Sequence, residues 1–215
     1  MNYKHIIFDI DGTLLDTEHA TLHSLQDTIR ELQHRTLALS ELGFAMFIPD
    51  KEALKQLGVS DIGHGMQVWQ DHFKLHLSTV SVFKGIRELL EELRKRRYKL
   101  GIITSEGRQE YKQGFLHFGL EGFFETVICA EDTVRHKPDP EPMKKYLQAT
   151  GASEKEVLFI GDSVYDMQCA SDAGVNCGLV LWGRHSVRPI RATYYFNAPG
   201  DILNLLNNGT AGLTN

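Results

Sequence analysis

The chain has 215 residues, a hydrophobic content of 42% and a formal net charge of −5 at pH 7. This length suits one or two globular domains with a sizeable core, and the acidic balance gives no reason to expect nucleic acid or an anionic membrane as a partner. No apolar run approaches the ~18 residues of a membrane span and no charged-then-apolar leader precedes the first strand. Three cysteines without a CxxC pair suit free thiols. We therefore expect a cytoplasmic protein.

The first predicted element is a strand over residues 6–8, a continuous apolar run typical of a strand buried on both faces of a parallel sheet. Asp9 and Asp11 follow directly, and Gly12 allows a sharp turn after them. Ligands of open parallel sheets bind beyond the carboxyl ends of the strands. The sequence thus predicts an acidic site at this strand end, with room for an anion or a metal ion.

The next 65 or so residues change in character. From Glu18 to Val80 apolar side chains recur at three- and four-residue spacing, and Gly43, Pro49, Gly58 and Gly63 break the segment into about four helices. We therefore predict a helical unit over residues 17–80, inserted into a second unit made of residues 1–16 and 81–215.

From residue 81 onward helical and strand patterns alternate. Buried strands are predicted at residues 100–103, 126–129, 157–160 and 178–181, with helices between them. Such βα alternation predicts an α/β fold in which a parallel sheet carries helices on both faces.

Reactive side chains follow several of these strands, and we expect them at one sheet edge: Asp9, Asp11, Thr104, Ser105, Lys137, Asp162 and Asp166. A single acid after a strand is more often a helix N-cap. If the acids converge, however, each pair at ~4 Å repels by ~4 kcal/mol at an effective dielectric near 20, so cations must join them. An all-oxygen acidic site suits Mg²⁺. The positive charge of Lys137 and the hydroxyl donors of Thr104 and Ser105 would suit the binding of a phosphoryl group beside the metal ion.

Four segments carry a family resemblance. The run from Asp9 to Thr13, Thr104 after an apolar strand, Lys137 in His-Lys-Pro-Asp-Pro, and the run from Gly161 to Asp166 resemble the four ordered motifs of the haloacid dehalogenase superfamily of phosphohydrolases. The resemblance covers nearly the whole chain. It implies a Rossmann-like parallel-sheet core with an inserted α-helical cap that moves.

The resemblance also implies a role for each motif residue. Asp9 is the nucleophile that forms an aspartyl phosphate, and Asp11 is the acid and base, with its backbone carbonyl at the metal. Asp162 is a direct Mg²⁺ ligand with Asp166 as a ligand or outer partner, and Thr104 and Lys137 hold the phosphoryl oxygens. The substrate is a small phosphorylated metabolite.

Two other functions remain open. Sugar-phosphate mutases of the β-phosphoglucomutase type share the acid matched by Asp11, but they place a histidine in the first cap helix where this chain has Thr21. A phosphate-binding signalling module is the alternative from another class, although the large helical insertion argues against it. Phosphoglycolate-phosphatase-like members are more similar, in Asp16-Thr17 and in Trp182-Gly183. Phosphoglycolate-like compounds and sugar phosphates are therefore the first substrates to test. The sequence does not indicate an oligomeric state.

Histidines of the helical segment allow further hypotheses. Glu18, His19 and Thr21 lie at the entry to the segment and are candidate substrate contacts, against the alternative of a polar helix start. His72 and His76 lie four residues apart, a spacing that can bind zinc. No third ligand motif accompanies them, which favours histidines that face solvent or line the cap.

Overall fold

A computed structural model of the chain describes residues 2–183 and 190–210. The chain divides into two compact units, one made of Met1–Leu15 with Val82–Asn215 and the other of Asp16–Ser81. Two short strands, β2 (Leu15–Asp16) and β3 (Ser81–Val82), pair with each other where the chain passes between the units. In the described parts of the chain, no helix is long and apolar enough to cross a membrane.

The first unit is built on a six-stranded sheet in the order β5-β4-β1-β6-β7-β8, and every neighbouring pair is parallel. Its strands are β1 (His5–Phe8), β4 (Lys99–Ile103), β5 (Thr126–Ile128), β6 (Val157–Gly161), β7 (Asn176–Val180) and β8 (Tyr194–Phe196). β1 lies in the middle, with Phe8 in register with Ile102 of β4 and Ile160 of β6. The predicted α/β fold with a parallel sheet is confirmed, and the three central strands end at the same edge.

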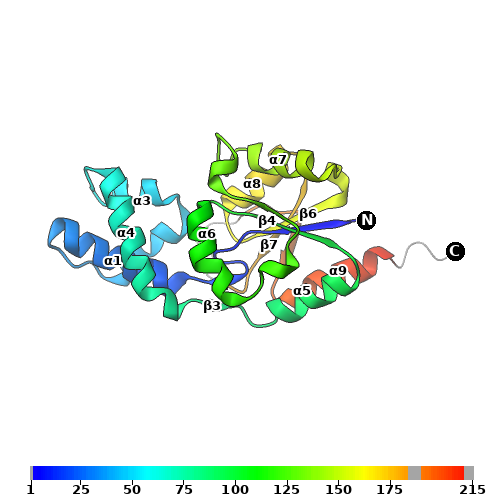
Figure 1. The fold of residues 1–215 in the computed structure, drawn as a ribbon, viewed down its shortest axis with the longest axis horizontal. Helices are drawn as coiled ribbons and strands as arrows, with labels where there is room; N and C mark the ends of the chain where they lie inside the picture. Colours follow the sequence, from blue (N-terminus) through cyan, green and yellow to red (C-terminus); the bar gives the residue numbers. More distant parts are fainter. Residues whose placement is uncertain (1, 184–189, 211–215) are drawn as a thin grey trace. The chain divides into compact units, whose positions relative to one another are not determined.

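Helices cover both faces of this sheet (Figure 1). α5 (Ile86–Lys95) and α9 (Pro199–Thr210) pack together on one side, and α7 (Glu141–Thr150) packs with α8 (Val164–Asp172) on the other. The short helix α6 (Arg108–Gly114) follows β4. Because both faces are covered, the side chains of β1 from Ile6 to Phe8 are fully buried.

The second unit consists mainly of two antiparallel helical stretches and their connection. Its helices are α1 (Glu18–Gln33), α2 (Leu39–Leu42), α3 (Asp50–Gln56) and α4 (Ile62–His76), with 3₁₀ turns at Gly43–Phe47 and Leu77–Thr79. α1 packs against α4, and Trp69 of α4 donates its indole N–H to Ser24 Oγ of α1 at 2.9 Å. The predicted break between the third and fourth helices lies just before α4, which begins at Ile62, so Gly63 is in the first turn of α4; Asp61 caps this helix by accepting from the His64 N–H.

Candidate active site

The candidate site begins at the carboxyl end of β1. The Asp9 N–H donates to the Ile160 carbonyl at 2.9 Å, so the first residue after β1 is still held against β6. The chain then turns at Gly12, whose φ of +70° is left-handed. A Cβ on Gly12 would lie 2.2 Å from Asp162 Oδ2. Glycine at this turn therefore lets the β1 loop approach the acid that follows β6.

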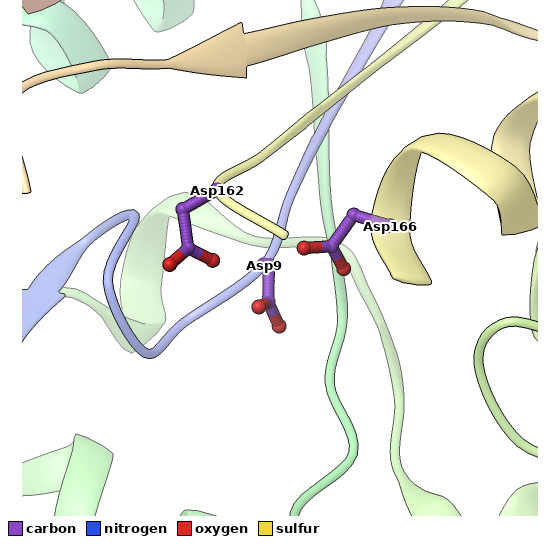
Figure 2. A group of neighbouring side chains, drawn as sticks. All are labelled: Asp9, Asp162 and Asp166. Atoms are coloured by element: carbon purple, nitrogen blue, oxygen red, sulfur yellow. The ribbon is translucent and has the colours of Figure 1, made fainter. Parts of the chain in front are cut away.

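Three carboxylates converge at this edge (Figure 2). Asp9 follows β1, Asp162 follows β6 and Asp166 lies in the first turn of α8; one oxygen from each lies within 4.8 Å of the others. A Cβ on Gly161 would lie 2.6 Å from the Asp166 Cβ, so a glycine is also required where β6 ends. The three acids thus lie close together because the backbone at Gly12 and at Gly161 packs against Asp162 and Asp166.

Both oxygens of Asp166 already have partners. Its Oδ2 accepts from the Ser163 N–H at 3.0 Å and from the Ser163 hydroxyl at 2.5 Å, which closes the N-terminus of α8. Its Oδ1 accepts from Lys137 Nζ at 2.6 Å, and the side chain is fully buried. Asp166 therefore fixes both the start of α8 and the position of the lysine.

Lys137 lies between two of the acids. Its Nζ is 2.8 Å from Asp9 Oδ1 and 2.6 Å from Asp166 Oδ1, and only 5% of its side chain is exposed. Burial alone would lower the pKa of Lys137, but the charges of Asp166 and Asp9 outweigh it and raise that pKa. The ammonium is thus held charged and pointed at Asp9.

One lysine does not neutralise this cluster. Burial raises the pKa of Asp9 to about 7, since the charges of Asp166 and Asp11 add to its effect and Lys137 only partly opposes them. Burial, followed by the charges of Asp166 and Asp9, also raises the pKa of Asp162 well above its usual value. Clustered carboxylate oxygens with excess negative charge are the donor set that a hard divalent cation prefers, so the residues fit such an ion.

Thr104 and Ser105 follow β4 at the same edge. Thr104 is 5% exposed, and its Oγ1 accepts from the Glu106 N–H at 3.1 Å. The Lys137 ammonium donates to the Ile103 carbonyl at 3.5 Å, which places the end of β4 beside the lysine. Ser105 is exposed. The predicted edge therefore assembles from β1, β4, β6 and the loop that carries Lys137.

A sequence model of the haloacid dehalogenase-like hydrolase family matches residues 6–180, the span that carries all of these side chains. The chain belongs to this family. A pyrophosphatase named PpaX from Bacillus cereus (strain AH820) is 29% identical over 218 residues, which cover 96% of this chain and 98% of that protein. The PpaX pyrophosphatase of Halalkalibacterium halodurans is 26% identical over 210 residues, with the same coverage.

Solved structures agree with the family assignment. A candidate phosphoglycolate phosphatase from Lactobacillus plantarum is 30% identical and superposes with a TM-score of 0.88, covering 95% of this chain and 100% of that one. The haloacid dehalogenase-like hydrolase described here is therefore an enzyme of the phosphatase class, which removes the signalling module as an alternative.

Two features of this hydrolase were missed from its sequence. The indole N–H of Trp182 donates to the Thr13 carbonyl at 3.0 Å, and a Cβ on Gly183 would lie 3.0 Å from the Gly12 carbonyl oxygen. Trp182-Gly183, noted only as a sign of family similarity, thus packs on the turn after Asp9. The signal was a tryptophan–glycine pair directly after a predicted strand.

The second missed residue is Glu106. Its Oε2 is buried and has no hydrogen-bond partner among the described residues. Burial raises the pKa of Glu106 well above its usual value, and the charges of Asp11, Glu110 and Asp9 raise it further. An acid two residues after Thr104, at the end of a buried strand, was the signal in the sequence. A carboxyl group with this environment beside Asp11 is a candidate for substrate selection.

The cap candidates lie in the other unit of the hydrolase. Glu18, His19 and Thr21 occupy the first turn of α1; His19 is exposed and the other two are half-buried. Their role as substrate contacts stays a prediction.

Proposed function

We propose that the chain is a Mg²⁺-dependent phosphatase of small phosphomonoesters that works through an aspartyl phosphate on Asp9. The observation that supports this most directly is the buried arrangement of Asp9, Asp162 and Asp166 around the Lys137 ammonium. A carboxylate held by a charged lysine at a strand end is oriented for attack, while the lysine offsets the negative charge of an incoming phosphoryl group.

In the first half-reaction, a carboxylate oxygen of Asp9 forms a bond to phosphorus as the bond from phosphorus to the leaving oxygen breaks. The Asp11 carboxyl gives its proton to that leaving oxygen, which departs as an alcohol. In the second half, water attacks phosphorus, Asp11 takes its proton, and the bond from phosphorus to Asp9 breaks to release inorganic phosphate. The proton on Asp11 is thus restored for the next turnover.

Asp9 and Asp162 would hold the Mg²⁺ together with the Asp11 backbone carbonyl. When bound, the ion supplies positive charge that stabilises the phosphoryl oxygens in the transition state. Asp166 supports the site from outside, since both of its oxygens are engaged by Ser163 and Lys137. Thr104 would donate its hydroxyl to a phosphoryl oxygen, and Ser105 is a second donor at the same loop.

Phosphoglycolate-like compounds and sugar phosphates remain the proposed substrates, and pyrophosphate joins them because two relatives carry the name pyrophosphatase. The helical unit would act as a cap that shields the reaction and selects the leaving group, with Glu18, His19 and Thr21 as its proposed contacts. A mutase would instead return the phosphoryl group to the sugar, so analysis of the products from a sugar 1-phosphate separates the two functions.

The test is hydrolysis of an aryl phosphate with and without Mg²⁺, in the parent and in Asp9→Asn. We expect activity only with the metal, and a loss on the order of 10⁴-fold or more in the variant because the nucleophile is absent. Asp16→Asn is the matched control, since this exposed aspartate lies just beyond the turn. Parent-like turnover in Asp9→Asn would rule out the aspartyl phosphate.

A further inference from the structure

The second unit contains six of the ten histidines of the chain: His19, His23, His34, His64, His72 and His76. Three of them gather on the α1–α4 pair. The rings of His19 and His23, one turn apart on α1, stack with centroids 4.0 Å apart. The ring of His76, at the end of α4, lies 5.8 Å from His23 and 6.5 Å from His19. Figure 1 shows α1 (blue) beside α4 (cyan).

The backbone that carries these rings is fixed by packing. Leu25 and Trp69 lie in the buried core of the unit, and the Trp69–Ser24 hydrogen bond joins α4 to α1 next to His23. The three rings are thus brought together by two packed helices.

The acids nearby complete the arrangement. His76 Nε2 lies 2.9 Å from Asp27 Oδ2, so Nδ1 is the ring nitrogen with which His76 would bind an ion. His72 has a different acid, with its Nε2 2.9 Å from Glu31 Oε2. The pair His72 and His76, four apart in sequence, is therefore engaged by two separate carboxylates of α1, and the gathered set is His19, His23 and His76.

We propose that His19, His23 and His76 form a binding site for a borderline transition-metal ion such as Zn²⁺ on the surface of the helical unit. Imidazole is a preferred ligand for such ions. Three imidazoles around one tetrahedral ion, with metal–nitrogen distances of about 2.0–2.1 Å, have ring centroids on the order of 5 Å apart. The observed separations of 4.0, 5.8 and 6.5 Å bracket that value, and binding of one ion requires rotation of these side chains to bring three nitrogens together.

Asp27 strengthens the assignment because of where it lies. Metal-ligating histidines usually donate their other ring N–H to a carboxylate, which fixes the tautomer and the ring orientation. The contact between His76 and Asp27 has this geometry before any ion binds.

The ionisation of His23 favours a cation over an anion as ligand. Partial burial lowers the pKa of His23, and the neighbouring His19 and His76 lower it further, while Asp27 opposes them. A neutral imidazole has a lone pair to give to a metal, whereas an anion such as phosphate needs the protonated ring.

The consequence of binding is a cross-link between the two longest helices of the unit. Ligands from α1 and from the end of α4 add this cross-link to the packed helix pair while the ion is bound, so thermal unfolding of the unit shifts upward with ion concentration. This inference does not depend on the proposed phosphatase chemistry, because no residue of the acidic cluster takes part; His19 is the one residue that is also a proposed substrate contact, so His23→Gln is the variant that tests the ion site alone.

The test is calorimetric titration of the full chain with Zn²⁺ in excess Mg²⁺, together with Co²⁺ absorption as a signature of nitrogen ligands. We expect one ion per chain, with affinity at least tenfold weaker in His23→Gln and in His19→Gln. His72→Gln is the matched control and keeps the parent affinity. Asp162→Asn also keeps it, because that substitution affects only the acidic cluster.

Several results would overturn the proposal. Equal weakening in His72→Gln would place the ion elsewhere on the helix pair, and loss in Asp162→Asn with retention in His23→Gln would place it at the acidic cluster. If His23→Gln instead loses binding of inorganic phosphate, the cluster is an anion site. The fluorescence of Trp69 checks that each variant keeps the α1–α4 packing.

Discussion

The two units of the molecule hold their charged side chains in different ways. In the first unit, the side chains of Lys137, Asp9 and Asp166 are 5%, 11% and 0% exposed and form one connected cluster. In the second, His72 and Glu31 form a separate pair in which the glutamate is 57% exposed. A buried cluster cannot lose one charge without leaving the others uncompensated, whereas water replaces the partner of an exposed pair. Only the first arrangement is suited to strong electrostatic catalysis.

The two units should differ most in how much the free energy of unfolding falls when one charged side chain is removed from each. Lys137→Met leaves Asp9 and Asp166 buried without their cation, and should lower the free energy of unfolding by about 3–5 kcal/mol at pH 7.5. Glu31→Gln removes an exposed partner and should cost less than about 1 kcal/mol. Urea denaturation of both variants measures the difference, and similar losses would show that the buried cluster is not coupled in this way.

The next effect tests whether the units unfold separately. Leu25 is fully buried in the core of the helical unit, so Leu25→Ala should cost about 3 kcal/mol there. The two tryptophans report on one unit each, Trp69 on the second and Trp182 on the first. With Trp69 as the only tryptophan (Trp182→Phe background), Leu25→Ala should shift the fluorescence-detected unfolding transition to lower denaturant concentration. With Trp182 as the only tryptophan (Trp69→Phe background), Leu25→Ala should leave the transition unchanged.

Leu90→Ala is the reciprocal control, since Leu90 is fully buried on α5 of the first unit. It should move the Trp182 transition alone. If both probes move together for either variant, the two units form one cooperative structure.

The sequence was most informative where strands end. The apolar runs before Asp9, Thr104 and Asp162 identified buried parallel strands, and the geometry of parallel sheets then placed these residues at one edge without further information. The pairing of β1 with β4 and β6 follows that expectation. Most of the candidate site was therefore predictable because one topological rule governs several segments.

The remainder depended on packing that no local pattern contains. The engagement of both Asp166 oxygens needs the start of α8 and the Lys137 loop to be placed together. The histidine cluster joins positions more than fifty residues apart, and the spacing of His72 and His76 pointed to a pair that the structure assigns to two different acids. Helical periodicity shows which face is buried, but not which residue of another helix lies opposite.

The stabilisation of the protein by Mg²⁺ should depend on pH in a way that identifies the acidic cluster as the binding site. Burial raises the pKa of Asp9 in the folded protein to about 7. Without a cation, the stability that protonated Asp9 contributes is therefore fully present below the pKa of Asp9 in the unfolded chain, and it is lost as the pH rises through about 7. A divalent cation binds the ionised carboxylates, so Mg²⁺ should stabilise the protein more at pH 8 than at pH 5. At 100 times Kd the gain is about 2.7 kcal/mol.

Thermal unfolding with and without Mg²⁺ at the two pH values measures this effect. A gain of that size corresponds to a rise in Tm of about 5–10 °C for a chain of this length. Asp162→Asn removes a proposed ligand and should abolish the rise at pH 8. An equal rise at pH 5 and pH 8 would mean that Mg²⁺ stabilises the chain elsewhere than at the ionised cluster.

The smallest effect concerns Glu106, whose Oε2 is buried without a partner among the described residues. Burial and the charges of Asp11, Glu110 and Asp9 raise the pKa of Glu106, so the stability it contributes falls as pH rises above its unfolded pKa. Glu106→Gln keeps the shape but cannot ionise. The stability of Glu106→Gln relative to the parent should therefore increase from pH 5 to pH 8, by about 1 kcal/mol, since a buried carboxylate with one oxygen left without a hydrogen-bond partner is costly.

Denaturant unfolding at the two pH values tests this, with Glu88→Gln on the exposed side of α5 as the control that shows no such trend. Burial and the charge of Asp11 raise the pKa of Glu106, and a carboxyl with such a perturbed pKa is a candidate for selecting among leaving groups. Glu106→Gln should therefore change the ratio of kcat/KM between an anionic substrate such as phosphoglycolate and an uncharged aryl leaving group, in favour of the anionic one. An unchanged ratio, with the stability trend present, would make Glu106 a buried acid that does not contact the substrate.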